Sequence, residues 1–211
     1  MFKESASSMN ITLDAQALDL FQRYYRELLI WNKKMNLTSV RGPDEIIIKH
    51  FIDSLAPLPY IACREGRLLD VGSGGGFPGI PLKIVLPDLH LSLLEASRKK
   101  SSFLRHVIRH LPLSRTNVIH DRVESVMIEN TYQHAFDTVI SRAAFKLPHL
   151  FVMGRFFLSQ GGLLIAMKGP HLEAEEKNAL HDPNMPCVAC YDTSLPSNGG
   201  QRKIMIFQVY P

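Results

Sequence analysis

Residues 68–82 read LLDVGSGGGFPGIPL, and this stretch decides the fold. An apolar run that ends in Asp70 predicts a β-strand, and a helix is expected just after the glycines. Between them Gly72, Gly74 and Gly76 form a G-x-G-x-G pattern. Glycine allows backbone dihedrals closed to other residues and lets the main chain approach a ligand closely. The stretch predicts the first turn of a nucleotide-binding α/β unit, and a purely structural tight turn is the alternative.

Strand and helix patterns alternate on the C-terminal side of this turn. Such alternation argues for a parallel sheet with helices on both faces. The predicted strands are RLLDVG (67–72), LHLSLLEA (89–96), TNVIHD (116–121), FDTVISRA (136–143), GGLLIAMKG (161–169) and RKIMIFQVY (202–210). Helices are expected at 79–87, at 97–111 and, as a short one, before the fifth strand. The stretch 181–201, rich in Pro, Asn, Ser and Gly, is the expected long loop.

The first sixty residues carry a purely helical pattern. Apolar residues at three- and four-residue spacing predict a helix from a cap at Thr12 through about Lys34. After a break at Arg41-Gly-Pro-Asp, a second helix is expected at 44–55. The expected organisation is one compact domain, made of an N-terminal helical extension, 1–60, packed on a core, 61–211.

Composition excludes several classes of protein. The chain has 211 residues, 45% hydrophobic and 21% charged, as in ordinary globular proteins. No run approaches the roughly 18 to 20 apolar residues of a membrane span. The start, MFKESASSMN, lacks the apolar core of a signal peptide and is expected to be a frayed tail. Three cysteines fit a reducing cytoplasm, and Cys187 and Cys190 form a C-x-x-C without a second pair, so no metal site is expected.

Positive charge is concentrated in one segment. The net charge is +4, a mild lean toward a polyanionic partner. Residues 98–110, RKKSSFLRHVIRH, carry five basic residues, two histidines and no acid. A helix that faces RNA is one interpretation of this segment, and a solvated basic face is the other.

Two further details indicate what the glycine turn binds. Glu95 ends the next strand about 20 residues after the glycines, where a carboxylate can accept both hydroxyls of a ribose. Phe77 and Pro78 follow the glycines at once, so the helix start is poorly suited to a pyrophosphate. The lysine of a P-loop is absent, because no G-K-[ST] follows. The pattern favours S-adenosylmethionine (AdoMet), which carries an adenosine but no phosphate, over NAD.

The stretch DVGSGGGFPGIPL closely resembles the signature of the bacterial 16S rRNA guanine-N7 methyltransferases, the RsmG family, once named glucose-inhibited division protein B. The match spans about 31–169, and 201–203 resembles the basic turn near the family's end. The other matching motifs, in family order, are Trp31-Asn32, Asn36-Leu37-Thr38, HFIDSL (50–55), Leu94-Glu95, Lys100, Phe103-Leu104, Arg122-Val123-Glu124, ISRA (140–143) and Lys168-Gly169. The resemblance implies a class I AdoMet-dependent methyltransferase (Rossmann-like) fold.

The resemblance also implies roles for particular residues. The cofactor-binding set would be Asp70, Gly72, Ser73, Gly74, Gly76, Phe77, Glu95, Val123, Glu124 and Arg142. In it, the glycine turn would hold the methionine part of AdoMet, Glu95 the ribose, and Val123 and Glu124 the adenine. The implied substrate is a guanine in the 530 loop of 16S rRNA, in free rRNA or in a small ribosomal subunit particle. We expect a monomer in the cytoplasm.

Methyl transfer to guanine N7 fits the residues present. The N7 lone pair needs no deprotonation, so positioning is required but a general base is not. The sequence has no [DN]-P-P-[YF] motif for exocyclic amino groups and no cysteine in a P-C or T-C motif after the fourth strand. Arg142 stands there instead and is expected to position the base by bonding O6, by stacking or through a phosphate. A salt-bridged loop arginine is the alternative.

Basic residues around the expected pocket are candidates for phosphate contacts without sequence preference. They are Lys33, Lys34, Arg98, Lys99, Lys100, Arg105, Lys168, Arg202 and Lys203. His50 and Asp53, three apart on one helix, are expected to form a buried hydrogen-bonded pair. Asn36 and Thr38 are expected to cap or brace the helix junction.

Two other functions stay open on the sequence alone. One is an AdoMet-dependent methyltransferase of another RNA or of a small molecule. The other is a non-catalytic protein that binds AdoMet and RNA, against which the retained Arg142 and the complete glycine turn argue.

Overall fold

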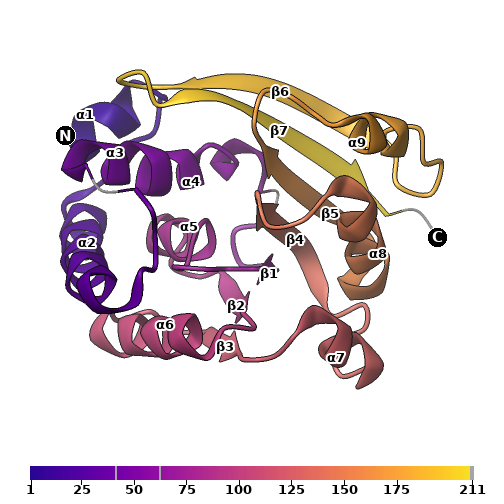
Figure 1. Cartoon of the computed structure of the whole chain (residues 1–211), viewed down its shortest axis with the longest axis horizontal. Coiled ribbons are helices and arrows are strands. Elements are labelled where there is room, and N and C mark those ends of the chain that lie inside the picture. The colour runs from indigo at the N-terminus through magenta and orange to yellow at the C-terminus, as the bar shows by residue number, and fades with distance from the viewer. Residues whose placement is uncertain (41, 62, 210–211) are drawn as a thin grey trace.

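A computed structural model describes residues 1–40, 42–61 and 63–209 as a mixed sheet with helices on both faces (Figure 1). Within these residues the sheet has seven strands in the order β3-β2-β1-β4-β5-β7-β6. They are β1 (Arg67–Val71), β2 (His90–Leu94), β3 (Thr116–Ile119), β4 (Phe136–Arg142), β5 (Leu158–Lys168), β6 (Cys187–Leu195) and β7 (Gly200–Gln208). The first five are parallel and β7 runs antiparallel to both its neighbours. The expected break at Arg41 and strand end at Tyr210 fall on residues outside these ranges.

The parallel strands form because their apolar runs are buried on both faces. Leu68, Leu69 and Val71 of β1 are fully buried, as is typical of parallel sheets covered by crossover helices. One face is covered by α5 (Gly79–Val85) and α6 (Arg98–His110), the other by α7 (Val123–Ile128) and α8 (Leu147–Phe157). The strand order reverses between β1 and β4, and ligands of such sheets bind in the crevice outside the carboxyl ends of these strands.

The N-terminal helices pack on the side of α5 and α6 (Figure 1). They are α1 (Phe2–Ser7), α2 (Ala15–Met35), α3 (Pro43–Ile46), a π-helical turn η1 (Ile47–Ile52), α4 (Asp53–Leu55) and a short 3₁₀ turn η2 (Leu58–Tyr60). The predicted cap at Thr12 is wrong, because the side chain of Asp14 accepts from the backbone N–H of Ala17 at 2.7 Å and caps α2. The predicted helix over 44–55 is present as one continuous helical segment, with the π-helical turn in its middle.

Two segments predicted to be irregular are ordered. The start of the chain is helical rather than frayed, because Phe2 packs on Phe21 at 5.6 Å and on Phe51 at 5.2 Å between ring centroids. The expected loop 181–201 contains β6, which pairs with β7 along the sheet edge. Most β6 side chains are exposed, so the strand carries no apolar alternation to reveal it. A short helix, α9 (Ala174–Ala179), precedes this edge.

Candidate functional site

The glycine turn after β1 is anchored to the end of β2. The backbone N–H groups of Gly72 and Ser73 donate to the carbonyl of Leu94, at 2.9 and 3.1 Å. The Ser73 hydroxyl donates to the carbonyl of Asp70 at 2.8 Å. Gly72 has a φ of +73° and Gly76 of +94°, conformations that only glycine adopts at little steric cost. The turn is thus a fixed wall of the crevice between β1 and β4.

Asp70, just before the glycine turn, and Gly76, the last glycine of the turn, are both buried. The carboxyl group of Asp70 is fully buried, Oδ2 accepts from the backbone N–H of Gly79 at 2.9 Å, and Oδ1 has no partner among the described residues. A Cβ on Gly76 would lie 2.5 Å from Ile80 Cδ1 and 2.6 Å from the Tyr24 hydroxyl. Neither Asp70 nor Gly76 is among the described residues that line the two pockets at this edge of the sheet. The structure thus shows Asp70 and Gly76 supporting the turn, and their contact with a cofactor stays a prediction.

We expect replacement of Asp70 by asparagine to flatten the pH dependence of stability. Burial raises the pKa of Asp70 to about 7, although the Gly79 hydrogen bond opposes this. Between about pH 4 and pH 7 the folded protein therefore keeps a proton that the unfolded chain releases. The free energy of unfolding falls as the pH rises through this window, by at most about 1.4 kcal/mol per pH unit. Urea denaturation at about pH 5, 6 and 7 should show wild type losing stability relative to Asp70→Asn.

Asp137→Asn is the matched control for this experiment. Burial would raise the pKa of Asp137, but hydrogen bonds from Arg67 outweigh it and hold the pKa below its ordinary value. The contribution of Asp137 is thus lost only in more acidic solution, and its difference from wild type should stay constant over the same range. An equally constant difference for Asp70→Asn would contradict the raised pKa.

The first pocket lies beyond the C-terminal ends of β1, β2 and β3 and has a volume of about 290 Å³. The structure brings four predicted cofactor residues together on its walls, namely Gly72, Glu95, Val123 and Glu124. The buried carboxylate of Glu95 accepts from the backbone N–H of Gly74 and of Ser97, each at 2.8 Å. A carboxylate has about four lone-pair positions, so Glu95 is fixed in place with acceptor capacity left for two hydroxyl groups.

The second pocket adjoins the first at Gly72, which lines both, and has a volume of about 280 Å³. Its walls combine the glycine turn, Phe77 and Arg142 with Thr38, Ser39 and His50 from the N-terminal helices and the chain between them. An elongated ligand with an adenosine in the first pocket can therefore reach the second past Gly72. The second pocket is where its far end would meet an acceptor molecule.

Arg142, the last residue of β4, is both a pocket residue and a member of an ion pair. Its Nη1 donates to Asp53 Oδ2 at 3.3 Å and to the Lys49 carbonyl at 2.8 Å. Its Nη2 lies 3.1 Å from Nδ1 of His50. The guanidinium carbon lies 5.3 Å from the centroid of the Phe77 ring, within cation–π range. Arg142 is thus salt-bridged, as the second alternative expected, and it also lines the second pocket, while its role in positioning a base stays a prediction.

His50 and Asp53 do not bond to each other as expected, in the part of the chain that the structure describes. Each bonds to Arg142 instead, and both carboxylate oxygens of Asp53 also accept from Nε of Arg202, at 3.1 and 3.0 Å. Burial, reinforced by the charges of Arg142 and Lys49, lowers the pKa of His50 to about 3, so the ring is neutral at physiological pH. These residues lie on or next to the π-helical turn, a feature frequent at functional sites.

Tyr24 is a residue of the site that the sequence analysis missed. It is buried on α2, its hydroxyl donates to the carbonyl of Gly75, and its ring stacks on Phe77 with centroids 5.3 Å apart. A tyrosine on the apolar face of a helix usually finds a hydrogen-bond partner when buried. The sequence therefore indicated that the Tyr24 hydroxyl has a partner, but it did not indicate that this partner is the glycine turn.

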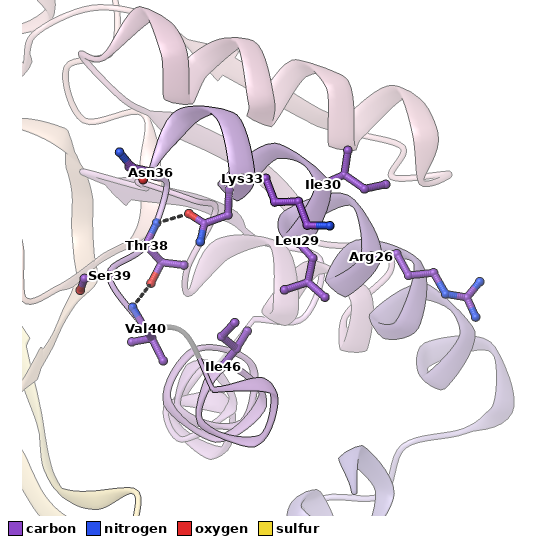
Figure 2. Close-up of a pocket in the computed structure, with 10 residues that line it drawn as sticks. Arg26, Leu29, Ile30, Lys33, Asn36, Thr38, Ser39, Val40 and Ile46 are labelled. Carbon is purple, nitrogen blue, oxygen red and sulfur yellow. Dashed lines mark hydrogen bonds between the residues drawn. The ribbon is translucent and has the colours of Figure 1, made fainter.

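A groove of about 900 Å³ opens beside the C-terminal half of α2 (Figure 2). Arg26 and Lys33 of α2 and Ile46 of α3 lie on its walls. Thr38 and Ser39 line both the groove and the second pocket. No acidic side chain is among the described residues that line it. Asn36 caps α2 with a φ of 50°, and the side chain of Asn32 accepts from the backbone N–H of Thr38, so the junction is braced.

The predicted phosphate-binding residues fall into two groups. Lys33, Lys34, Arg98, Lys99 and Arg105 are exposed and Lys100 is half-buried. The other three residues already have anionic partners. Lys168 is buried and pairs with Glu176 at 2.7 Å, Arg202 pairs with Asp53, and Lys203 lies 2.6 Å from Asp192. Lys168 is thus largely buried in an ion pair, and its contact with a phosphate stays a prediction.

Other classes of site find no support in the described residues. No three His, Cys, Asp or Glu side chains gather among them so that they could hold a metal ion. Cys187 and Cys190 are exposed, free thiols on β6. None of the helices over 1–40, 42–61 and 63–209 is both long and apolar enough to cross a membrane.

The sheet order, the glycine turn after β1 and the paired pockets at its edge define the class I AdoMet-dependent methyltransferase fold. A putative O-methyltransferase from Klebsiella pneumoniae superimposes with a TM-score of 0.63 at 16% identity, over 99% of this chain and 96% of that one. A SAM-dependent methyltransferase from Aquifex aeolicus gives 0.61 at 15% identity, over 82% and 97%. Likeness at these identities shows the fold, and it confirms the predicted fold class.

Sequence similarity gives the family. The chain belongs to the GidB family, described as rRNA small subunit methyltransferase G, whose model matches residues 17–205. It is 42% identical to the ribosomal RNA small subunit methyltransferase G of Syntrophus aciditrophicus (strain SB), over 99% of this chain and 88% of that protein. It is 41% identical to the protein of that name from Geotalea uraniireducens (strain Rf4), over 96% and 93%. The family expected from the motifs is confirmed.

Proposed function

We propose that this chain transfers the methyl group of AdoMet to N7 of a guanine in the 530 loop of 16S rRNA, in the cytoplasm. The observation that carries the proposal is the pair of adjoining pockets that meet at Gly72, one with Glu95 and the other with Arg142. The relatives' common name supports small-subunit rRNA as the substrate.

The residues of the first pocket fit the adenosine of AdoMet. Glu95 would accept the ribose hydroxyls with the lone pairs that Gly74 and Ser97 leave free, and Val123 and Glu124 would contact the adenine. The backbone of the glycine turn, with Phe77, would hold the methionine part. AdoMet supplies a methyl group already activated by its sulfonium. The chain's task is thus to hold this group and the acceptor in line.

The second pocket fits an acceptor that needs no deprotonation. Both ring nitrogens of His50 are engaged, Nδ1 with Arg142 and Nε2 with Thr38 at 2.6 Å, and the low pKa of His50 keeps the ring neutral. His50 is therefore unsuited to act as a general base, which N7 does not require. Arg142 would position the base by stacking or by its remaining N–H donors.

The groove beside α2 would receive the RNA strand that flanks the target base. Arg26 and Lys33 lie on it, Lys34 follows in the last turn of α2, and Thr38 and Ser39 connect it with the second pocket. Cations without neighbouring acids attract phosphates regardless of sequence. The exposed basic residues of α6 would extend this attraction.

Labelled AdoMet tests the proposal directly. We expect the wild type to transfer label to one guanine when it is incubated with 16S rRNA or small-subunit particles, as mapped by nuclease digestion and mass spectrometry. Glu95→Ala should bind AdoMet about 10 to 100 times more weakly in calorimetry, because a charged acceptor for two hydroxyls is lost. Label in another RNA would favour a different substrate. AdoMet binding with no transfer to any RNA would favour a binding protein.

A further inference from the structure

The hydroxyl group of Thr38 stands at the junction of the groove and the second pocket. Its Oγ1 lies 2.6 Å from Nε2 of His50 and 3.1 Å from the backbone nitrogen of Val40. Figure 2 shows the second of these contacts, and Thr38 on the wall of the groove. Thr38 is half-buried and lines the second pocket, so a ligand there would contact this residue.

Arg142 determines the direction of the hydrogen bonds in this network. A guanidinium has only donors, so Nδ1 of His50 must accept from Nη2 of Arg142. The neutral ring then carries its hydrogen on Nε2, and Nε2–H donates to Oγ1 of Thr38. The backbone N–H of Val40 donates to the same oxygen. Both lone pairs of the Thr38 hydroxyl are thus occupied.

The hydrogen of the Thr38 hydroxyl is left to donate. Among the described residues, the hydrogen-bond partners of Oγ1 are His50 and Val40, and both of them donate. The hydroxyl is usually both donor and acceptor, but here the network makes it a donor only. In a pocket it will therefore favour a ligand that presents an acceptor and disfavour one that presents a second donor.

We propose that Thr38 selects guanine over adenine by donating a hydrogen bond to O6 of the target base. This inference rests on the proposed function. O6 is the acceptor beside N7 on the guanine edge, whereas adenine has a donating amino group at that position. Nη1 of Arg142 is already committed to Lys49 and Asp53, and Nη2 in part to His50. Thr38 is therefore a donor whose hydrogen the network leaves unengaged, beside the N–H groups that remain to Arg142.

A double-mutant cycle on enzyme and RNA tests the proposal. Thr38→Val removes the hydroxyl, and 2-aminopurine at the target nucleotide removes O6 but keeps N7. We expect either change alone to lower kcat/KM by about 5- to 100-fold. The two changes together should lower kcat/KM little more than the RNA change alone, because both remove the same hydrogen bond. Thr38→Ser keeps the hydroxyl and should keep most of the preference for guanine.

A purely bracing role of Thr38 predicts a different result. Thr38→Val would then lower methylation of both RNAs by the same factor, and this outcome overturns the proposal. Where the analogue RNA is methylated too slowly to measure, dissociation constants of the same four pairs with S-adenosylhomocysteine bound give the cycle. Thr116→Val, on the outer strand β3, is the control and should leave both RNAs unaffected. Failure of the wild type to methylate the guanine RNA would instead contradict the proposed function.

Discussion

The free energy of unfolding of the Asp53→Asn variant is expected to be about 3 to 5 kcal/mol lower than that of the wild type. Asp53 is only 2% exposed and accepts from both Arg142 and Arg202. Asparagine has nearly the same shape without the charge. Two guanidinium groups would therefore stay close together in a largely buried site without an anion. Urea denaturation near pH 7, followed by circular dichroism, measures the loss.

The matched control for this variant is Asp192→Asn. The carboxylate of Asp192 lies 2.6 Å from the ammonium group of Lys203, but its side chain is 75% exposed. Exposed ion pairs contribute about 0 to 1 kcal/mol, so this variant should resemble the wild type. If Asp53→Asn lowered the free energy of unfolding no more than Asp192→Asn does, the negative charge of Asp53 would not be needed to stabilise Arg142 and Arg202 in the folded protein.

The Gly72→Ala variant is expected to bind AdoMet about 10 to 100 times more weakly than the wild type. A Cβ at this position would lie 2.8 Å from Cβ of Ala144 and 3.0 Å from the ring of Phe145, at a φ of +73°. Phe145 lines the first pocket and Gly72 lines both pockets. Overpacking costs about 1 to 3 kcal/mol, and each 1.4 kcal/mol that reaches the binding step is a factor of ten in affinity. Isothermal titration measures the change.

Gly161→Ala separates the collision from the backbone strain. Gly161 has nearly the same φ, +75°, but nothing lies within 4 Å of its added Cβ. It stands on β5, away from both pockets. The variant should lose about 1 to 2 kcal/mol of stability from the left-handed conformation while its AdoMet affinity stays unchanged. Equal AdoMet affinities for the two alanine variants would show that the contacts at Gly72 do not shape the site.

The interior of the fold could be predicted from the sequence because its strands are apolar on both faces. The run that became β1 is buried almost throughout, and such runs have few alternatives to a covered parallel strand. The edge strand β6 could not be predicted in this way, since Leu195 is its only buried residue among those described. The helix α1 has six residues and depends on the packing of Phe2, which a local pattern does not contain.

The candidate site could be predicted only where residues follow strand ends. Glu95 and Arg142 come directly after or at the end of parallel strands, whose carboxyl ends meet at one edge of the sheet. Lys168 also ends a strand, and its positive charge suggested a phosphate contact. The contact with Glu176 of α9 that neutralises it depends on tertiary packing. The same holds for Thr38, whose hydroxyl direction is determined through His50 by Arg142, about a hundred residues away.

The hydrogen bond from the hydroxyl of Tyr24 to Gly75 has a consequence for chimeric proteins. It ties the glycine turn to α2, while Thr38 and His50 form one wall of the second pocket. A graft of this sheet onto foreign helices would lose the anchor of the glycine turn together with that wall. Exchanging the N-terminal helices alone would therefore not transfer the substrate specificity of one protein to another. On the proposed function, the residues that hold the methyl donor and those that position its acceptor would have to be kept together.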